Sequence, residues 1–274
     1  MEHPRSILKG KVAIVTGANR MGSIGAAISY LFAESKARVI MTARNIDELN
    51  KVVRSFGHCG SGISTLYGDM TEESDIENIT KVTAERFGHL DILVNNAGEN
   101  GLCGDEDVVN LDVSVWDRIF ETNARGTMLM AKHAIPLMIK EGGGSIINIS
   151  SGFASVGHIA HTAYACSKAA INTLTRYIAA QYGPQGIRCN SVSPGLIQTN
   201  GSSLMPESVA DAYRENCLLP RLGRPIDVAK LVGFLASDES DYMTGQNLII
   251  DGGFGSHVPF SIAKAESEFS GWPG

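Results

Sequence analysis

The chain has 274 residues, enough for one large α/β domain or two ordinary ones. Its 43% hydrophobic and 19% charged residues exclude a disordered chain and a small disulfide scaffold. A net charge of -6 argues against nucleic acid or an anionic membrane as the main partner, because both bind basic faces. Glycine is in excess, at 30 of 274 residues or about 11%, against roughly 7% in an average protein.

The cysteines indicate a reducing environment and no metal site. Five of them are present, an odd number, widely spaced and without a C-x-x-C pair; they are Cys59, Cys103, Cys166, Cys189 and Cys217. The N-terminal stretch lacks the apolar run of a signal peptide, and no stretch approaches the roughly 18 apolar residues of a membrane span. We therefore expect a soluble, cytoplasmic protein.

Short β-branched runs alternate with longer segments of helical periodicity, which is the pattern of βαβ units. The predicted strands are residues 12–16, 38–42, 64–67, 92–94, 145–149, 188–192 and 248–250. The main predicted helices are residues 24–35, 72–87, 114–140 and 162–182. The strands are almost entirely apolar, as expected for parallel strands covered on both faces. We predict one doubly wound α/β domain over residues 1–256 and a tail over 257–274.

The first predicted strand runs into the glycine-rich loop TGANRMGSIG, residues 16–25, which opens directly into a helix. Such a loop lets the backbone approach a pyrophosphate, and the helix N-terminus supplies free N–H groups. Gly17, Gly22 and Gly25 do not have the standard G-x-G-x-x-G spacing. A tight turn without a ligand is therefore the alternative.

The second predicted strand ends without a carboxylate, in Met41-Thr42-Ala43-Arg44. An acidic residue at this place usually binds the ribose hydroxyls of NAD. Arg44, and Arg20 in the glycine-rich loop, could instead bind a 2′-phosphate. We predict NADP(H), with NAD(H) possible and with solvated surface arginines as the alternative.

Tyr164 and Lys168 lie four residues apart in a predicted helix and so share one of its faces. A neighbouring ammonium favours the phenolate and lowers the phenol pKa from its usual value of about 10. Ser150 and Ser151 follow the fifth predicted strand, at the edge of the sheet where ligands bind. A hydroxyl there could hydrogen-bond a substrate oxygen.

These residues and their contexts resemble the short-chain dehydrogenase/reductase family over residues 11–253, nearly the whole chain. The motifs that carry the resemblance are the TG loop, NNAG at 95–98, Asn123 in ETNARG, ISS at 149–151, YACSK at 164–168 and SPGLIQT at 193–199. The resemblance implies a seven-stranded parallel Rossmann sheet. It also implies hydride transfer between a nicotinamide cofactor and a carbonyl/alcohol pair. The sequence itself shows no metal-ligand cluster.

The resemblance assigns catalytic roles to four residues. Tyr164 is the implied general acid during reduction, and the base in the reverse direction. Lys168 lowers the pKa of the Tyr164 phenol and holds the nicotinamide ribose. Ser151, thirteen residues before the tyrosine, polarises the carbonyl. Asn123 kinks its helix and holds a water that links Lys168 to solvent.

The resemblance also implies a set of cofactor contacts. Asp69 and the Met70 amide would meet the adenine, and Asn95, Ala97 and Gly98 would lie beside the adenosine ribose. The remaining contacts are Gly17, Asn19, Arg20, Met21, Gly22, Ser23, Ile24 and Gly25 in the first loop, Tyr164 and Lys168, and Pro194, Gly195, Ile197 and Thr199 near the carboxamide and diphosphate. The first loop is two residues longer than the family pattern T-G-x-x-x-G-x-G. Its S-I-G ending is similar to the enoyl reductase branch, which however spaces its tyrosine and lysine more widely.

Substrate selection is expected from residues 198–220 and from side chains that flank the serine and tyrosine. These are Phe153, Val156, His158, His161, Leu196, Leu204 and Met205, which suit a small apolar or cyclic ketone. A 3-oxoacyl thioester reductase and a non-catalytic dinucleotide sensor are the alternatives. We also expect a homo-oligomer, a tetramer or dimer, in which the tail with Phe260, Phe269 and Trp272 covers a neighbouring site.

Overall fold

The computed structural model describes residues 7–99, 104–200 and 206–257. Seven strands form one parallel sheet in the order β3-β2-β1-β4-β5-β6-β7. The strands are β1 (Val12–Thr16), β2 (Arg38–Ala43), β3 (Ile63–Tyr67), β4 (Ile92–Asn95), β5 (Gly144–Ile149), β6 (Ile187–Pro194) and β7 (Asn247–Ile250). The strand order reverses between β1 and β4, and ligands of such sheets bind at this point, outside the carboxyl ends. The predicted doubly wound sheet of seven parallel strands is confirmed.

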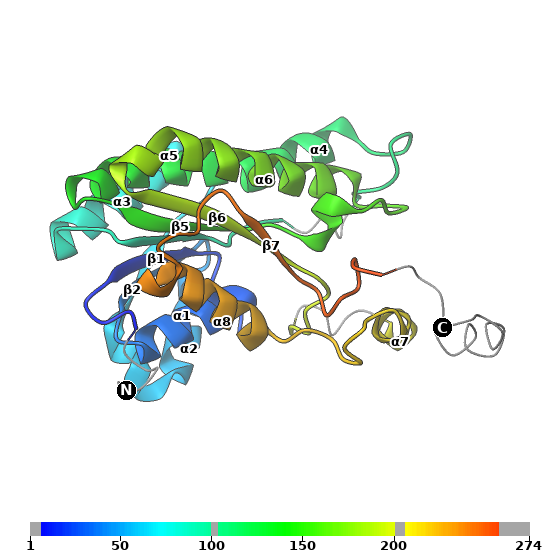
Figure 1. The fold of residues 1–274 in the computed structure, drawn as a ribbon, viewed down its shortest axis with the longest axis horizontal. Coiled ribbons are helices and arrows are strands. Elements are labelled where there is room, and N and C mark those ends of the chain that lie inside the picture. The colour runs from blue at the N-terminus through cyan, green and yellow to red at the C-terminus, as the bar shows by residue number, and fades with distance from the viewer. Residues whose placement is uncertain (1–6, 100–103, 201–205, 258–274) are drawn as a thin grey trace, which may run out of the picture.

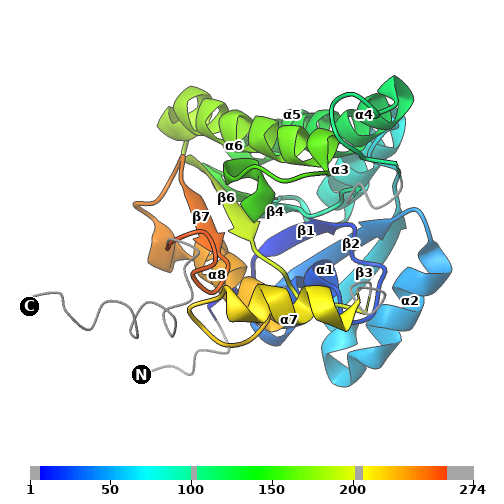
Figure 2. The same cartoon turned by 90° about the vertical axis from the view of Figure 1, so that its right-hand side faces the viewer.

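Helices cover both faces of the sheet (Figure 1). One face carries α3 (Glu73–Phe87), α4 (Val113–Phe120), α5 (Gly126–Lys140) and α6 (Thr162–Tyr182), and the other carries α1 (Ile24–Glu34), α2 (Ile46–Ser55) and α8 (Pro225–Ala236). The short helix α7 (Glu207–Glu215) lies apart from both layers in Figure 1, and in Figure 2 it crosses in front of α1. Its Tyr213 hydroxyl accepts a hydrogen bond from the N–H of Leu196, so α7 lies beside the carboxyl end of β6.

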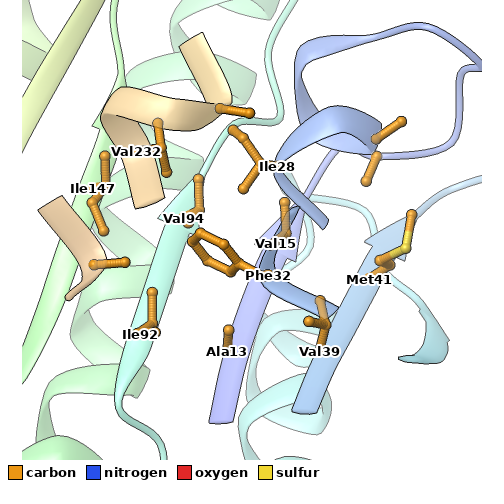
Figure 3. Close-up of a cluster of buried hydrophobic side chains, with 14 of the residues drawn as sticks. Ala13, Val15, Ile28, Phe32, Val39, Met41, Ile92, Val94, Ile147 and Val232 are labelled. Carbon is orange, nitrogen blue, oxygen red and sulfur yellow. The ribbon is translucent and has the colours of Figure 1, made fainter. Parts of the chain in front are cut away.

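The two faces of each central strand belong to two separate hydrophobic clusters. In β1, Ala13 and Val15 face α1 and α8, where they join Phe32 and Val232 (Figure 3). The alternate residues Val12 and Ile14 join the cluster beneath α3, α5 and α6. Each of the valine, isoleucine and phenylalanine side chains among them contributes about 1.5–3 kcal/mol through burial. This two-sided burial explains why the strands are apolar throughout.

The prediction of one continuous helix over residues 114–140 is wrong. The structure divides it into α4, a π-helical segment Glu121–Arg125 and α5. The π segment places Asn123 in the interior, fully buried. Gly126, the next residue after the π segment, packs against the loop before α3. A Cβ on Gly126 would come within 2.8 Å of the carbonyl oxygen of Met70 in that loop.

Among the described residues, no helix is both long and apolar enough to cross a membrane.

Candidate active site

Three of the four candidate catalytic residues line one cleft at the carboxyl edge of the sheet, with a volume of about 210 Å³. Tyr164 and Lys168 come from α6, and Ser151 follows β5. Asn123 lies behind the cleft, in the π segment. The lining residues are Ile24, Asn96, Gly98, Glu99, Ile149, Ser150, Ser151, Tyr164, Lys168, Pro194, Gly195, Ile197 and Thr199.

The two neighbouring serines make different contacts. Ser151 caps a short 3-10 helix, where its Oγ accepts the N–H of Phe153 at 3.2 Å, and it also hydrogen-bonds the Tyr164 phenol. Ser150 donates its hydroxyl to the main-chain carbonyl of Lys168 at 3.1 Å. Only Ser151 therefore shares a hydroxyl–hydroxyl contact with the tyrosine.

Lys168 is buried between α6 and the end of β5. Its ammonium donates to the main-chain carbonyl of Ile149 at 2.9 Å and lies 5.7 Å from the centre of the Tyr164 ring. Because charging a buried amine is costly, burial lowers the pKa of Lys168 to about 8. The lysine still carries its charge at neutral pH.

The pKa of the Tyr164 phenol is raised in the protein alone. Burial is the main cause, and the hydrogen bond from Ser151 opposes it. The net shift is therefore opposite to the one expected from the charge of Lys168, whose ammonium donates its hydrogen bond to the Ile149 carbonyl. The phenol is consequently protonated at neutral pH and able to donate a proton.

Asn123 connects the π segment to the loop after β4 and to α6. Its Oδ1 accepts the N–H of Glu99 at 2.7 Å, and its Nδ2 donates to the Glu99 carbonyl and to Ser167 Oγ, both at 3.0 Å. The side chain amide is thus fully used, and the expected irregularity of the helix at Asn123 is present. Its contacts fix the back wall of the cleft.

The glycine-rich loop fits a dinucleotide phosphate. Gly17 and Gly22 both have a φ of +67°, and a Cβ on Gly17 would come within 2.5 Å of the Ala97 Cα. Ser23 caps α1 through the N–H of Ala26, and no acidic residue lies in the first turn of α1. The helix N-terminus therefore presents N–H groups and a partial positive charge without a competing carboxylate.

The rest of this loop differs in exposure. Arg20 is exposed, Met21 is 47% exposed and Asn19 is partly buried. Ile24 and Gly25 begin α1, where Ile24 lines the cleft and a Cβ on Gly25 would come within 2.5 Å of the Asn96 amide nitrogen. The loop therefore lies against the segment after β4 on one side and leaves an arginine accessible on the other.

The structure brings Arg44 and Asp69 together. The Arg44 side chain is 72% exposed, and its guanidinium lies 3.8 Å from the Asp69 carboxylate. The other oxygen of Asp69 accepts the N–H and hydroxyl of Thr71, so this residue also forms a local turn. Met70 is buried. Arg44 and Asp69 lie at the ends of neighbouring strands, on the edge predicted to bind the adenosine end of the cofactor.

The segment after β4 combines structural contacts with cleft residues. Asn95 donates to the Asn148 side chain at 2.9 Å, and the Ala97 N–H donates to Thr16 Oγ1 at 2.9 Å. A Cβ on Gly98 would come within 3.2 Å of the Lys168 ammonium. Pro194, the last residue of β6, also lines the cleft, as do Gly195, Ile197 and Thr199 after it.

Three cleft residues, Asn96, Glu99 and Ile149, are absent from the predicted site. Asn96 donates its amide to the carbonyl oxygens of Thr16 and Gly17, and Glu99 pairs with Arg118 at 2.8 Å. The position of Asn96 inside the NNAG motif was an available signal. Glu99, which directly follows the motif, is recognisable only from its contacts in the fold.

Three of the residues expected to select the substrate gather their rings in one cluster, and they lie between Ser151 and Tyr164 in the sequence. The Phe153 ring lies 5.1 Å from His158 and 5.7 Å from His161. His161 is partly buried with its Nδ1 unpartnered in the structure, and burial lowers its pKa. Leu204 and Met205 lie outside the described residues, as do residues 258–274 of the tail.

Within residues 7–99, 104–200 and 206–257, no group of three or more histidine, cysteine, aspartate or glutamate side chains is arranged to hold a metal ion.

Comparison with known proteins agrees with this geometry. A family model described as enoyl-(acyl carrier protein) reductase matches residues 17–255. The chain is 41% identical over 256 residues to a probable short-chain type dehydrogenase/reductase of Bradyrhizobium diazoefficiens, covering 92% of this chain and 89% of that protein. It is 40% identical to a 7alpha-hydroxysteroid dehydrogenase of Clostridium sardiniense, covering 92% and 96%.

A solved structure is also similar, that of a putative short-chain dehydrogenase/reductase from Burkholderia xenovorans. The TM-score is 0.87 at 32% identity, with 92% of this chain and 99% of that chain covered. The fold, the order of its motifs and these relatives agree, and the chain belongs to the short-chain dehydrogenase/reductase family of oxidoreductases that act on CH–OH and C=O groups.

Proposed function

We propose that the protein is an NADP(H)-dependent oxidoreductase that interconverts a ketone and a secondary alcohol on a small, largely apolar or cyclic substrate. The observation that carries this proposal is the hydroxyl pair of Tyr164 and Ser151 in one cleft beside the Lys168 ammonium. Two hydroxyl donors that converge on one point can bind and protonate the oxygen of a carbonyl.

The roles of the side chains follow from their contacts. The glycine-rich loop and the cleft residues after β4 and β6 would hold the dinucleotide, whose nicotinamide would supply or accept the hydride. Ser151 donates a hydrogen bond to the substrate oxygen, and Tyr164 transfers its phenolic proton to that oxygen as negative charge develops there. The raised pKa of Tyr164 keeps this proton available at neutral pH.

Lys168 and Asn123 support this proton transfer. The positive charge of Lys168 stabilises the phenolate that Tyr164 leaves behind. In the oxidation direction the same phenolate accepts the proton. Asn123 fixes the start of the Glu99 segment and, through Ser167, the helix that carries both Tyr164 and Lys168.

The choice of NADP(H) is supported by the two arginines at the adenosine end. Arg44 is the first residue after β2 and is largely exposed, and Arg20 is exposed in the glycine-rich loop. A guanidinium can bind the 2′-phosphate in a bidentate manner. Arg44→Asp is expected to raise the KM for NADPH at least tenfold and to leave the KM for NADH unchanged or lower. Equal or better use of NADH by the unmutated protein contradicts this choice.

The preference for an apolar or cyclic substrate is supported by the cluster of rings of Phe153, His158 and His161, which lie between Ser151 and Tyr164 in the sequence. It is also supported by the relative named for its action on 7alpha-hydroxysteroids, which are cyclic alcohols.

An NADPH oxidation screen over cyclic ketones, sugars and 3-oxoacyl thioesters tests the proposed function. Tyr164→Phe should lower kcat by about 10²- to 10⁴-fold on every active substrate. Tyr177→Phe is the matched control, because Tyr177 lies on the same helix and is 63% exposed. Dinucleotide binding without turnover of any substrate would instead indicate a sensor, and equal rates of Tyr164→Phe and parent would exclude Tyr164 as the acid.

We further propose a cytoplasmic homo-oligomer, a tetramer or dimer. The described cysteines Cys59, Cys166, Cys189 and Cys217 are free thiols, as usual in a reducing compartment. The edge strand β7 exposes Ile249, which is 51% accessible. Ile249→Asp should lower the mass measured by light scattering; an unchanged mass argues against an interface at β7.

A further inference from the structure

The first turn of α6 is capped by a residue from a distant part of the chain. The first N–H groups of a helix have no partner within the helix and need acceptors from elsewhere. His161, at the cap position, is in the left-handed conformation with φ of 64°, and its side chain makes no capping hydrogen bond. Asp105, from the loop after β4, supplies both acceptors: its carboxylate oxygens accept the N–H groups of Ala163 at 2.8 Å and Tyr164 at 2.9 Å.

This cap requires a carboxylate. Each oxygen of Asp105 accepts one N–H, whereas an asparagine offers a single oxygen and would direct its NH₂ group at the second N–H. Asp105 is only 4% exposed, and a negative charge at a helix N-terminus interacts favourably with the helix dipole.

The main chain joins the same two segments. The carbonyl of Asp105 accepts the N–H of His161 at 3.0 Å, and the carbonyl of Glu106 accepts the Thr162 hydroxyl at 2.7 Å. The loop after β4 and the start of α6 are therefore held together on both sides of the carboxylate.

Tyr164 lies between this cap and a second anchor. One turn further along α6, Lys168 is bound to the end of β5 through its ammonium and through its carbonyl, which accepts the Ser150 hydroxyl. The amide of Tyr164 itself is bound by Asp105. The distance of the phenol from Ser151 and from a substrate thus depends on the Asp105 cap at one end and on β5 at the other.

We propose that Asp105 is a positioning residue for the reaction, acting through the main chain of Tyr164; this inference rests on the proposed function. Its carboxylate sets the start of α6, and with it the placement of the proton donor. Misplacing a reacting group by about 1 Å can cost about 100-fold in rate.

The test is Asp105→Asn in the full-length protein. We expect kcat to fall about 10- to 100-fold while the KM for the dinucleotide stays the same. Asp107→Asn is the matched control, since Asp107 is an exposed aspartate in the same loop whose carboxylate accepts hydrogen bonds from its close sequence neighbours Val109 and Asn110. This control should keep the parental kcat.

A double-mutant cycle separates positioning from general destabilisation. If Asp105 acts through Tyr164, Asp105→Asn should cause no further loss of kcat in the Tyr164→Phe background. An equal fold-loss in both backgrounds overturns the proposal, and so does an unchanged kcat in Asp105→Asn.

Amide hydrogen exchange provides a readout that does not need activity. Protection of the Ala163 and Tyr164 amides should fall in Asp105→Asn and stay unchanged in Asp107→Asn. Unchanged protection in Asp105→Asn contradicts the cap, and lost protection with a parental kcat contradicts its role in the reaction. Failure of the proposed function has a different signature, namely no turnover of any alcohol or ketone by the unmutated protein.

Discussion

The ammonium of Lys168 donates a hydrogen bond of 2.9 Å to the main-chain carbonyl of Ile149, where β5 ends. The lysine is 4% exposed, and its burial lowers its pKa from the usual 10.5 to about 8. Because the folded protein binds this proton less tightly than the unfolded chain does, the charged lysine destabilises the fold. The penalty is complete below about pH 8 and fades as the pH rises from 8 toward 10.5.

We therefore expect Lys168→Met to be more stable than the parent and inactive. At neutral pH, the lowered pKa corresponds to a destabilisation of the parent by about 3 kcal/mol, which the variant avoids. The variant also loses the hydrogen bond to Ile149, which costs it about 1 kcal/mol. The free energy of unfolding should rise by about 1–3 kcal/mol at pH 7, and the gain should shrink by pH 10. Urea unfolding at the two pH values measures it, and a variant less stable than the parent at pH 7 would contradict the assignment.

Substitution of the two serines after β5 is expected to affect different properties, kcat for Ser151 and stability for Ser150. Ser151→Ala removes the hydroxyl that contacts Tyr164 and should lower kcat about 100-fold with little change in stability. Ser150→Ala removes the hydrogen bond to the Lys168 carbonyl and should cost about 1 kcal/mol of stability with a much smaller loss of kcat. Steady-state kinetics and thermal unfolding of both variants measure this difference. The reverse ranking of the two kcat values would assign the substrate contact to Ser150.

A pair of left-handed glycines tests the phosphate loop. Gly17→Ala combines an unfavourable φ of +67° with a contact of 2.5 Å to the Ala97 backbone, whereas Gly10→Ala has a φ of +84° with no atom within 4 Å of the added Cβ. Both should lose about 1 kcal/mol to backbone strain, but only Gly17→Ala should lose dinucleotide binding. Fluorescence titration with NADPH and NADH measures the binding. Parental affinity in Gly17→Ala would exclude this loop from the cofactor site.

Two buried asparagines should differ in their contribution to stability. Asn123→Ala leaves the Glu99 main chain and the Ser167 hydroxyl without their partner and should cost about 2–3 kcal/mol, together with most of the activity. Asn172→Ala is the control, since the Oδ1 of Asn172 is buried without a hydrogen-bond partner in the structure. We expect it to cost less than about 1 kcal/mol. If urea unfolding shows equal losses of unfolding free energy in the two variants, the hydrogen bonds of Asn123 do not contribute to stability as proposed.

The sheet could be predicted from the sequence because each strand is marked by a pattern of neighbouring residues. Each strand is a short apolar run, and most of the candidate site residues lie at or just after a strand end, so strand ends and motifs indicate one edge of the sheet. The structure places Ser151, Tyr164 and Lys168 in one cleft there. Helices α2 and α8 are not among the main helices predicted from the sequence, although α2 is amphipathic, with Leu49 and Val52 buried.

Other features depend on contacts that sequence patterns do not register. The hydrophobic period runs through residues 114–140 without a break, and only the contacts of Asn123 with Glu99 and Ser167 reveal the π segment. The cap on α6 joins residues 58 positions apart. The raised pKa of Tyr164 likewise follows from burial, and not from the four-residue spacing that suggested a lower value.

The π segment also changes which way the helix faces. A π turn accommodates one extra residue, and one residue corresponds to a rotation of about 100° around a helix. Before it, Val115 and Ile119 of α4 join a small cluster with Ala163, at the start of α6. After it, Met130 and Met138 of α5 join the core over the sheet. Removing a single residue here, such as Ala124, would rotate one half away from its partner, so the length of this helix is constrained as strictly as its composition.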